Sequence, residues 1–335
     1  MRHDPDDGVR RTGKVTRLKW DVGGRIKCVC VVLPIESVGN LQSMYKVEGP
    51  ISKALYGSVW LCRNSKGRQS AVKRCDLSVC ATSDEETEYV RAEIESEKSV
   101  NLRLMHHSHR HIVKMEDQFL HDGVQHLVFE YCPNGDLLTE MQAQPEARFA
   151  QAQAIHYFRQ VVAAVAHLHS VGIAHRDLSL ENVLLDKHNE CKLCDFGLAV
   201  DVPSLHMDAV GKPNYMAPEV YAQDEYDPCK ADVWSLGMML FIMVTGVPLV
   251  EEPGASDNRF CILEAFGVHA LVNKWKMEAL FSGPVLELIE SMLEIDPAKR
   301  ITAAALKKAL GKLKEIHPIE LGSRKITNLV KRLFH

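Results

Sequence analysis

The sequence contains no apolar segment that suits a secretory leader or a membrane span. Its first fourteen residues, MRHDPDDGVRRTGK, are polar and of mixed charge, so they lack the apolar core of a signal peptide. The apolar run 26–35 is ten residues long and is interrupted by Lys27. Residues 233–250 are apolar over a longer stretch, but their glycines, proline, serine and threonine favour a helix buried in a protein core. We therefore expect an intracellular protein, cytoplasmic or nuclear, with no membrane span.

An excess of basic residues and an ordered cysteine pattern are also missing. The 40 lysines and arginines against 44 acidic residues give a net charge of −4, which offers no electrostatic case for nucleic-acid binding. The ten cysteines lie at irregular spacings, typical of reduced thiols rather than of a disulfide framework. With 335 residues, 46% of them apolar, the chain can form one large domain or two lobes around a cleft.

Two local patterns resemble metal sites without supplying a full ligand set. The run 106–111 holds four histidines, with His121 and His126 beyond, but no cysteine or carboxylate is interleaved at ligand spacing. Cys191 and Cys194 form a C-x-x-C, yet nothing pairs with them at a zinc-site spacing, and strand alternation would direct the two side chains to opposite faces. We favour a connecting loop and a strand, with zinc binding by the histidines as the alternative.

Periodicity predicts strands and helices along the rest of the chain. Alternating apolar residues predict strands at 45–48, 57–62, 69–74 and 126–132, and a hairpin joining 182–186 to 191–194. Helical periodicity predicts helices at 84–105 and 147–170, and a final helix with a tail within 303–335. For residues 1–44 we expect a partly disordered N-terminal extension that adds one strand to the small sheet.

The chemistry-bearing residues gather around the segment 175–182, HRDLSLEN. Asp177 can orient and deprotonate an attacking hydroxyl, and Asn182 together with Asp195, thirteen residues later, can hold magnesium on phosphates. Further markers lie at wide but ordered spacings: Lys73 in Ala-Val-Lys, Glu97, Glu219 in Ala-Pro-Glu, Asp232 and Arg300.

In order and spacing these residues resemble the eukaryotic protein kinase family of the serine/threonine type, nearest in pattern to calcium/calmodulin-dependent, AMP-activated and checkpoint-type kinases. The resemblance implies an α+β bilobal kinase fold. Its small lobe, an antiparallel sheet with one helix, covers 45–130, its mainly helical large lobe covers 134–312, and 313–335 form a tail. It also implies ATP and Mg²⁺ as cofactors, protein substrates with Ser/Thr acceptors, and a monomer.

The resemblance assigns roles residue by residue. The catalytic residues are Lys73, Glu97, Asp177, Asn182 and Asp195, and Mg²⁺ falls to Asn182 and Asp195. Glu97 is preferred to Glu93 as the partner of Lys73, because it places Leu104 and His106 in the family's helix-end pattern. The nucleotide-binding residues are Gly57, Val59, Ala71, Lys73, Phe129, Glu130, Cys132, Asp136 and Leu184.

The family's structural and specificity positions are also filled. Asp232 is expected to tether the backbone of the catalytic loop, which is the segment 175–182. Arg300 is expected to pair with Glu219. Asp136 and Glu181 lie where related enzymes recognise basic residues upstream of the target, so we expect a modest preference for arginine there.

The glycine-rich loop departs from the family pattern. Ser52 and Ala54 occupy the first two glycine positions, and only Gly57 remains. Because Cβ atoms restrict the backbone, we expect a stiffer and weaker ATP clamp.

The activation segment, between Asp195 and Glu219, also departs from the family pattern. Asp208 replaces the threonine that is usually phosphorylated eleven residues before Glu219. We expect Asp208 to reach Arg176 and partly replace the phosphate, so that neither Ser204 nor another site must be phosphorylated for activity.

A third departure concerns two positions at once. Ser179 stands where most serine/threonine kinases have lysine, and Lys212 stands where they have threonine. Our hypothesis is an exchange, in which the Lys212 ammonium supplies the cation beside Asp177 and makes Lys212 a catalytic residue. The alternative is loss of both residues, and a pseudokinase or weakly active nucleotide-binding scaffold.

Overall fold

A computed structural model describes residues 15–20, 26–31, 45–54, 57–76, 84–121 and 123–313 of the chain. Within it the chain divides into two compact units, one of residues 1–91 and 118–128, the other of residues 92–117 and 129–335. Each unit has its own hydrophobic core.

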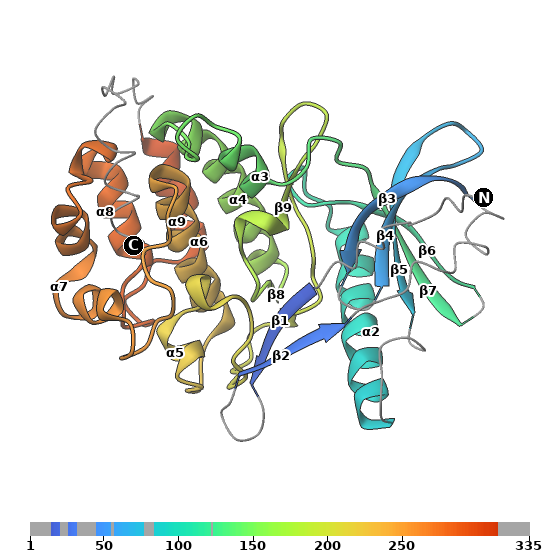
Figure 1. Cartoon of the computed structure of the whole chain (residues 1–335), viewed down its shortest axis with the longest axis horizontal. Helices are drawn as coiled ribbons and strands as arrows, with labels where there is room; N and C mark the ends of the chain where they lie inside the picture. The colour runs from blue at the N-terminus through green and yellow to red at the C-terminus, as the bar shows by residue number, and fades with distance from the viewer. Residues whose placement is uncertain are drawn as a thin grey trace, which may run out of the picture. The chain divides into compact units, whose positions relative to one another are not determined.

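The first unit is built on a five-stranded sheet in the order β3-β4-β5-β7-β6 (Figure 1). The strands are β3 (Lys46–Ala54), β4 (Gly57–Arg63), β5 (Gln69–Asp76), β6 (Met115–His121) and β7 (Val124–Glu130). Four of them confirm expected strands. β6 was not expected, because its sequence MEDQFLH is mostly polar and alternates weakly. The small core of this unit is formed by Cys62, Val72 and Val128, with Tyr45, Val47, Trp60 and Phe119 packed against it.

The N-terminal region differs from the single added strand that we expected. β1 (Val15–Trp20) pairs antiparallel with β2 (Ile26–Val31), and the two form a separate two-stranded sheet. The expectation was wrong because the apolar run finds its pairing partner in the basic run before it. The predicted disorder of the other residues up to 44 lies outside the described residues, as does the predicted tail from residue 314.

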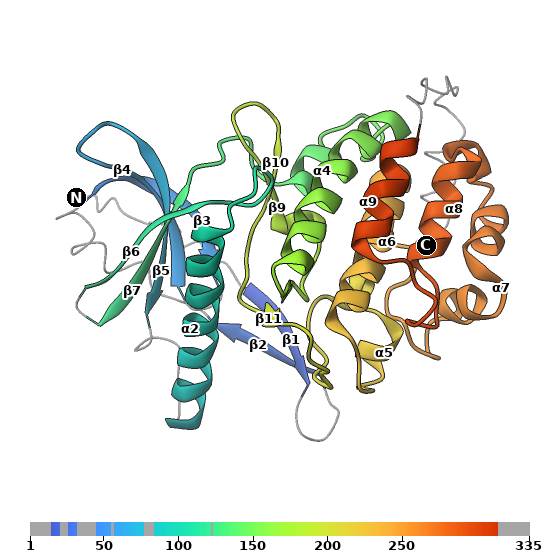
Figure 2. The same ribbon diagram turned by 180° about the vertical axis from the view of Figure 1, so that it is seen from behind.

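The second unit is mainly helical. Its helices are α3 (Leu137–Gln142), α4 (Gln151–Ser170), α5 (Pro218–Tyr221), α6 (Pro228–Thr245), α7 (Asn258–Lys274), α8 (Gly283–Met292) and α9 (Ala303–Lys312). The long helix α2 (Asp84–His106) belongs to both units, and its second half contributes Val100 and Leu104 to the core of this one. α4 packs against α6 and α9, and α6 also packs against α8 (Figure 2).

Short elements connect these helices and carry the site. β8 (Ile173–Ala174) pairs with β11 (Val200–Asp201), and β9 (Val183–Leu185) pairs with β10 (Cys191–Leu193) as the predicted hairpin. The 3₁₀ turns are η2 (Leu180–Asn182), η3 (Pro213–Tyr215) and η4 (Glu278–Leu280).

The ends of two predicted helices shift for identifiable reasons. α4 begins at Gln151 rather than at 147, because Ala147 has a φ of 50° and the Phe149 N–H donates to the Met243 carbonyl at 2.8 Å. α6 begins at Pro228, after the Asp227 cap, and ends at Thr245, where Gly246 caps it with a φ of 79°. Nearly all of α6 is buried, as expected for a core helix. In the described ranges, no helix combines the length and apolarity needed to cross a membrane.

Candidate active site

The catalytic loop begins directly after β8 and is held by a carboxylate from α6. Asp232 Oδ2 accepts the His175 N–H at 2.9 Å, and Oδ1 accepts the Arg176 N–H at 2.8 Å. Arg176 has a φ of 63°, a conformation that costs on the order of 1–3 kcal/mol for a non-glycine residue. The predicted tether is therefore confirmed, and it stabilises a strained turn.

A histidine that the sequence did not single out completes this anchor. His169, on α4, lies with Nε2 at 2.8 Å from Asp232 Oδ2. Burial opposes charge on the ring, but the hydrogen bonds and charges of Asp232 and Cys229 together outweigh burial and raise the pKa of His169 to about 10. Burial also opposes charge on Asp232 and so raises its pKa, but its partners, His169 above all, bring this pKa below the ordinary value. The pair is 63 residues apart, so no local pattern could have indicated it.

Asp177 and Asn182 are brought together as expected. The Asn182 Nδ2 group donates to the Asp177 carbonyl at 2.7 Å and to its carboxylate Oδ2 at 2.9 Å. These two bonds fix the orientation of the Asp177 carboxylate. Burial raises the pKa of Asp177, and the charge of Lys212 is the largest opposing influence.

The same two bonds orient Asn182 for a magnesium ion. Because its N–H groups are directed to Asp177, its amide oxygen is the atom available to a hard cation. Asp195, with a φ of 63°, supplies a carboxylate after β10. No cluster of three or more His, Cys, Asp or Glu side chains suited to a metal occurs in the part of the chain that the structure describes. Two oxygen donors plus phosphates fit Mg²⁺, which prefers a few carboxylate-type ligands with phosphate and water.

Glu97 lies beside the Asp195 segment. It is 5% exposed, whereas Glu93 one turn earlier is half-buried. A Cβ placed on Gly197 would lie 4.0 Å from Glu97 Oε2 and 3.5 Å from Asp195 Oδ1. This position favours Glu97 over Glu93 as the functional glutamate.

The expected nucleotide-binding residues fall into two groups, one in each unit. Gly57, Val59, Ala71 and Lys73 lie on β4 and β5, where Val59 pairs with Lys73 and Leu61 with Ala71. A Cβ on Gly57 would come within 1.8 Å of the Arg74 carbonyl oxygen, so β5 leaves no room for a side chain there.

The group in the second unit is fixed by interactions of its own. Glu130 accepts two bonds from the Lys192 ammonium, at 2.9 and 3.1 Å, and one from the Lys114 N–H at 2.8 Å. Phe129 beside it is half-buried. Cys132 is buried, which raises its pKa to about 12 and keeps the thiol protonated. These contacts hold the backbone of this segment in place.

Asp136 has a structural use that the sequence interpretation missed. Its carboxylate caps α3, accepting the Thr139 N–H at 2.7 Å and the Thr139 hydroxyl at 2.9 Å. Its backbone forms a bridge to Leu184, so these two expected nucleotide-binding residues lie side by side.

The predicted contact between Arg176 and Asp208 is confirmed. The Arg176 Nη1 group donates to both carboxylate oxygens, at 2.9 and 2.8 Å. The Tyr226 hydroxyl donates to the Asp208 carbonyl at 3.0 Å and lies 3.2 Å from Arg176 Nη1. His206 Nδ1 is 3.6 Å from Asp208, and its Nε2 is 2.9 Å from the Ser204 hydroxyl. The activation segment is thereby bound to the catalytic loop.

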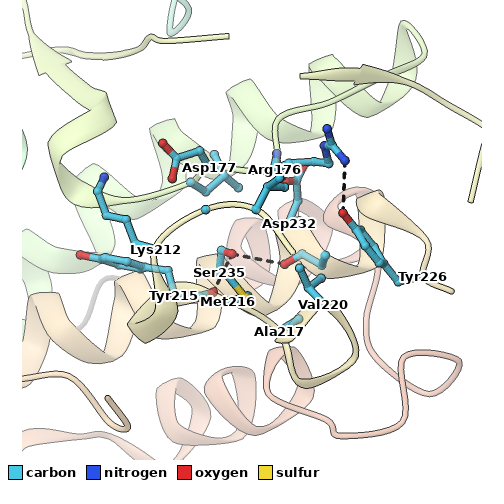
Figure 3. A pocket seen from close by; sticks show the side chains of 14 residues that line it. Arg176, Asp177, Lys212, Tyr215, Met216, Ala217, Val220, Tyr226, Asp232 and Ser235 are labelled. Carbon is cyan, nitrogen blue, oxygen red and sulfur yellow. Dashed lines mark hydrogen bonds between the residues drawn. The ribbon is translucent and has the colours of Figure 1, made fainter. Parts of the chain in front are cut away.

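Lys212 and Ser179 also meet. The Lys212 ammonium donates to the Ser179 hydroxyl at 2.6 Å and lies 3.6 Å from Glu181 Oε1. In Figure 3 the ends of the Lys212 and Asp177 side chains point out of the same side of the pocket.

The predicted pair of Arg300 and Glu219 is also present. The Arg300 guanidinium donates to the two Glu219 carboxylate oxygens at 2.6 and 3.0 Å, and both residues are buried.

The two candidate metal patterns show other uses. His109 stacks on His167 with ring centroids 5.0 Å apart, and burial lowers its pKa to about 4. Cys191 is buried, and Cys194 Sγ lies 3.4 Å from the Asn182 carbonyl oxygen. Both cysteines are free thiols.

Known proteins match the part of the chain that carries this geometry. The model of the family described as "Protein kinase domain" matches residues 45–310. CBL-interacting protein kinase 29 of Oryza sativa subsp. japonica is 31% identical over 267 residues, which are 78% of this chain and 57% of that protein. Serine/threonine-protein kinase SAPK3 of Oryza sativa subsp. indica is 32% identical over 244 residues, 70% of this chain and 71% of its own.

An animal protein matches a shorter region. The hormonally up-regulated neu tumor-associated kinase of Mus musculus is 35% identical over 204 residues, 57% of this chain and 26% of that protein. The chain thus spans little more than half of the first rice kinase and about a quarter of the mouse kinase.

Proposed function

This chain belongs to the protein kinase family, of the serine/threonine type, and from that membership we propose that it is an active enzyme whose activation segment needs no phosphorylation. It transfers the γ-phosphoryl group of ATP to serine or threonine hydroxyls of protein substrates. The observation that carries this proposal is the fixed pair of Asp177 and Asn182 in a loop tethered by Asp232.

The residues divide the work in a definite way. Asp177 accepts the proton of the substrate hydroxyl and orients it, with its carboxylate held in place by the Asn182 amide. Mg²⁺, when held by Asn182 and Asp195, supplies positive charge on the phosphate oxygens. Lys73 binds the α- and β-phosphates. Retention of all these groups supports an enzyme over a pseudokinase scaffold.

Independence from phosphorylation rests on the charge that Arg176 already meets. A phosphate beside this arginine would neutralise it and order the segment. The Asp208 carboxylate neutralises Arg176 through bonds of 2.8 and 2.9 Å from Nη1, although it carries less charge than a phosphate. The Tyr226 hydroxyl, which donates to the Asp208 carbonyl, helps to order the segment.

The substrate preference is proposed in a weaker form than the sequence suggested. Asp136 is engaged in capping α3 and Glu181 lies near the Lys212 ammonium, so neither carboxylate offers its full charge to a substrate arginine. We propose a slight preference for upstream basic residues and an intracellular monomer.

The test uses the 335-residue chain made in bacteria and treated with phosphatase. Transfer of labelled phosphate from ATP to a basic serine peptide is expected without further treatment, with Asp177→Asn as the inactive control. Asp208→Ala should lower the rate on the order of tenfold, as expected for loss of a coupling contact, while Asp208→Glu keeps most of it.

Two outcomes would count against the proposal. Thermal stabilisation by ATP and magnesium without any transfer would favour the scaffold. Activity that appears only after an added kinase modifies Ser204 or another site would refute independence from phosphorylation.

A further inference from the structure

The activation segment approaches the catalytic loop at Gly211. This residue has a φ of 96°, and a Cβ there would lie 2.9 Å from the Arg176 carbonyl oxygen and 3.7 Å from Asp177 Oδ1. Only glycine permits such an approach. The next residue, Lys212, therefore starts from backbone packed directly against the loop that carries Asp177.

From this position the Lys212 side chain returns to the catalytic loop. Its ammonium donates to Ser179 Oγ at 2.6 Å and lies 3.6 Å from Glu181 Oε1, so it is held by residues two and four positions after Asp177. Ser179 is fully buried, while 36% of the Lys212 side chain is exposed. The contact thus fixes the ammonium at the edge of the pocket without enclosing it.

The other basic side chains next to Asp177 are committed elsewhere. Arg176 donates to Asp208 and, through Nε, to the Leu198 carbonyl at 2.8 Å. Both ring nitrogens of His175 are engaged, because Nδ1 accepts the Asp177 N–H at 3.3 Å and Nε2 lies 3.0 Å from the Cys194 carbonyl oxygen. Among the described neighbours of Asp177 in this loop and in the 208–215 segment, Lys212 is therefore the cation that remains directed to the site.

We propose that Lys212 is a catalytic residue, which supplies from the activation segment the positive charge beside the phosphoryl group in transfer. This inference rests on the proposed kinase function. The bond between the γ-phosphorus and the oxygen of ADP breaks as the bond to the substrate oxygen forms, and the hydroxyl proton passes to Asp177. Lys212 keeps its protons and stabilises the charge on the moving phosphoryl oxygens.

Exchange of the two side chains is the sharpest test. Lys212→Met keeps the length and the apolar stem without the charge, and Lys212→Thr removes the cation. Both should lower kcat by about 10²-fold, the usual loss for one transition-state donor, with KM for the peptide and Tm little changed. The double variant Lys212→Thr, Ser179→Lys restores the more usual arrangement and should recover at least tenfold of that loss. Lys308→Ala, on the exposed face of α9, is the matched control and should keep wild-type activity.

A binding measurement separates this inference from the proposed function. Lys212→Met should weaken binding of a non-hydrolysable ATP analogue with magnesium several-fold and leave ADP binding unchanged, because only the analogue has a γ-phosphate. Turnover of Lys212→Met close to that of wild type, or no recovery in the double variant, would overturn the role. A wild type that binds the analogue but transfers nothing would refute the kinase function and, with it, the catalytic role of Lys212. In that case the analogue and ADP affinities of Lys212→Met would still show whether the Lys212 ammonium contacts the γ-phosphate.

Discussion

Two regions of this molecule depart from the kinase pattern, and they do so differently. In the catalytic loop and activation segment, each altered residue touches another altered or committed residue: Lys212 meets Ser179, and Asp208 meets Arg176. In the β3–β4 strand pair, Ser52 and Ala54 replace glycines and pair with the backbone of Val59 and Gly57.

The difference follows from what each position must do. The positive charge beside the Asp177 carboxylate needs a replacement when the usual lysine is lost, since the site must still stabilise the transferred phosphoryl group. Ser52 and Ala54 lie in β3 after a register shift between Pro50 and Ser52, and both pair with β4, a setting that accommodates a Cβ atom. Gly57 is retained because β5 packs against it. Compensation is therefore expected in the first region and is unnecessary in the second.

The largest effect on the free energy of unfolding is expected at the pair of His169 and Asp232, which anchors the catalytic loop. The pKa of His169 in the folded chain, about 10, lies above its ordinary value of 6.5, so the charged pair with Asp232 contributes fully below pH 6.5. That contribution is lost as pH rises towards 10, by an amount on the order of a few kcal/mol. Unfolding free energies of wild type should fall over this range, and those of His169→Gln should start lower and vary less.

Cys229 also faces the His169 ring and needs a control. Cys229→Ala should keep most of the alkaline loss if Asp232 is the dominant partner. Parallel pH curves for wild type and His169→Gln would show that the loop is held by Asp232 alone.

A smaller effect is expected at Gly57. Alanine there would place Cβ 1.8 Å from the Arg74 carbonyl oxygen, a backbone atom that cannot move alone, and should cost about 3 kcal/mol in unfolding free energy. Gly49→Ala, on β3 with no atom within 4 Å of the added Cβ, is the matched control and should be nearly neutral. Equal effects of the two changes in denaturant unfolding would break the comparison, because Gly57 would then have no packing reason to persist.

The sequence predicted what depends on ordered spacing. The contacts of Asp232 with the loop, of Arg300 with Glu219 and of Asp208 with Arg176 could all be anticipated, because each joins positions with a fixed place in the family pattern. The kinase fold followed from the same markers.

What escaped prediction depends on tertiary neighbours. The pairing of His169 with Asp232 joins two helices with no shared local signal. Asp136 was assigned to a ligand, but it was also the residue best placed to cap α3. β6 is polar enough to hide its alternation, since it is a sheet edge, and β2 pairs with β1 instead of joining the main sheet.

The smallest effect on stability and ATP affinity is expected at Ser52 and Ala54, where two glycines of the family pattern are missing. Restoring glycine by Ser52→Gly and Ala54→Gly should lower the unfolding free energy by about 0.5–1 kcal/mol each, because glycine loses more conformational freedom in a strand. ATP affinity should stay within about threefold of wild type, since Cβ atoms on an extended strand do not alter its backbone. A gain of tenfold or more would show that the missing glycines weaken the clamp, as the sequence first suggested. The β3–β4 departures would then need a compensating contact, as those around Asp177 do.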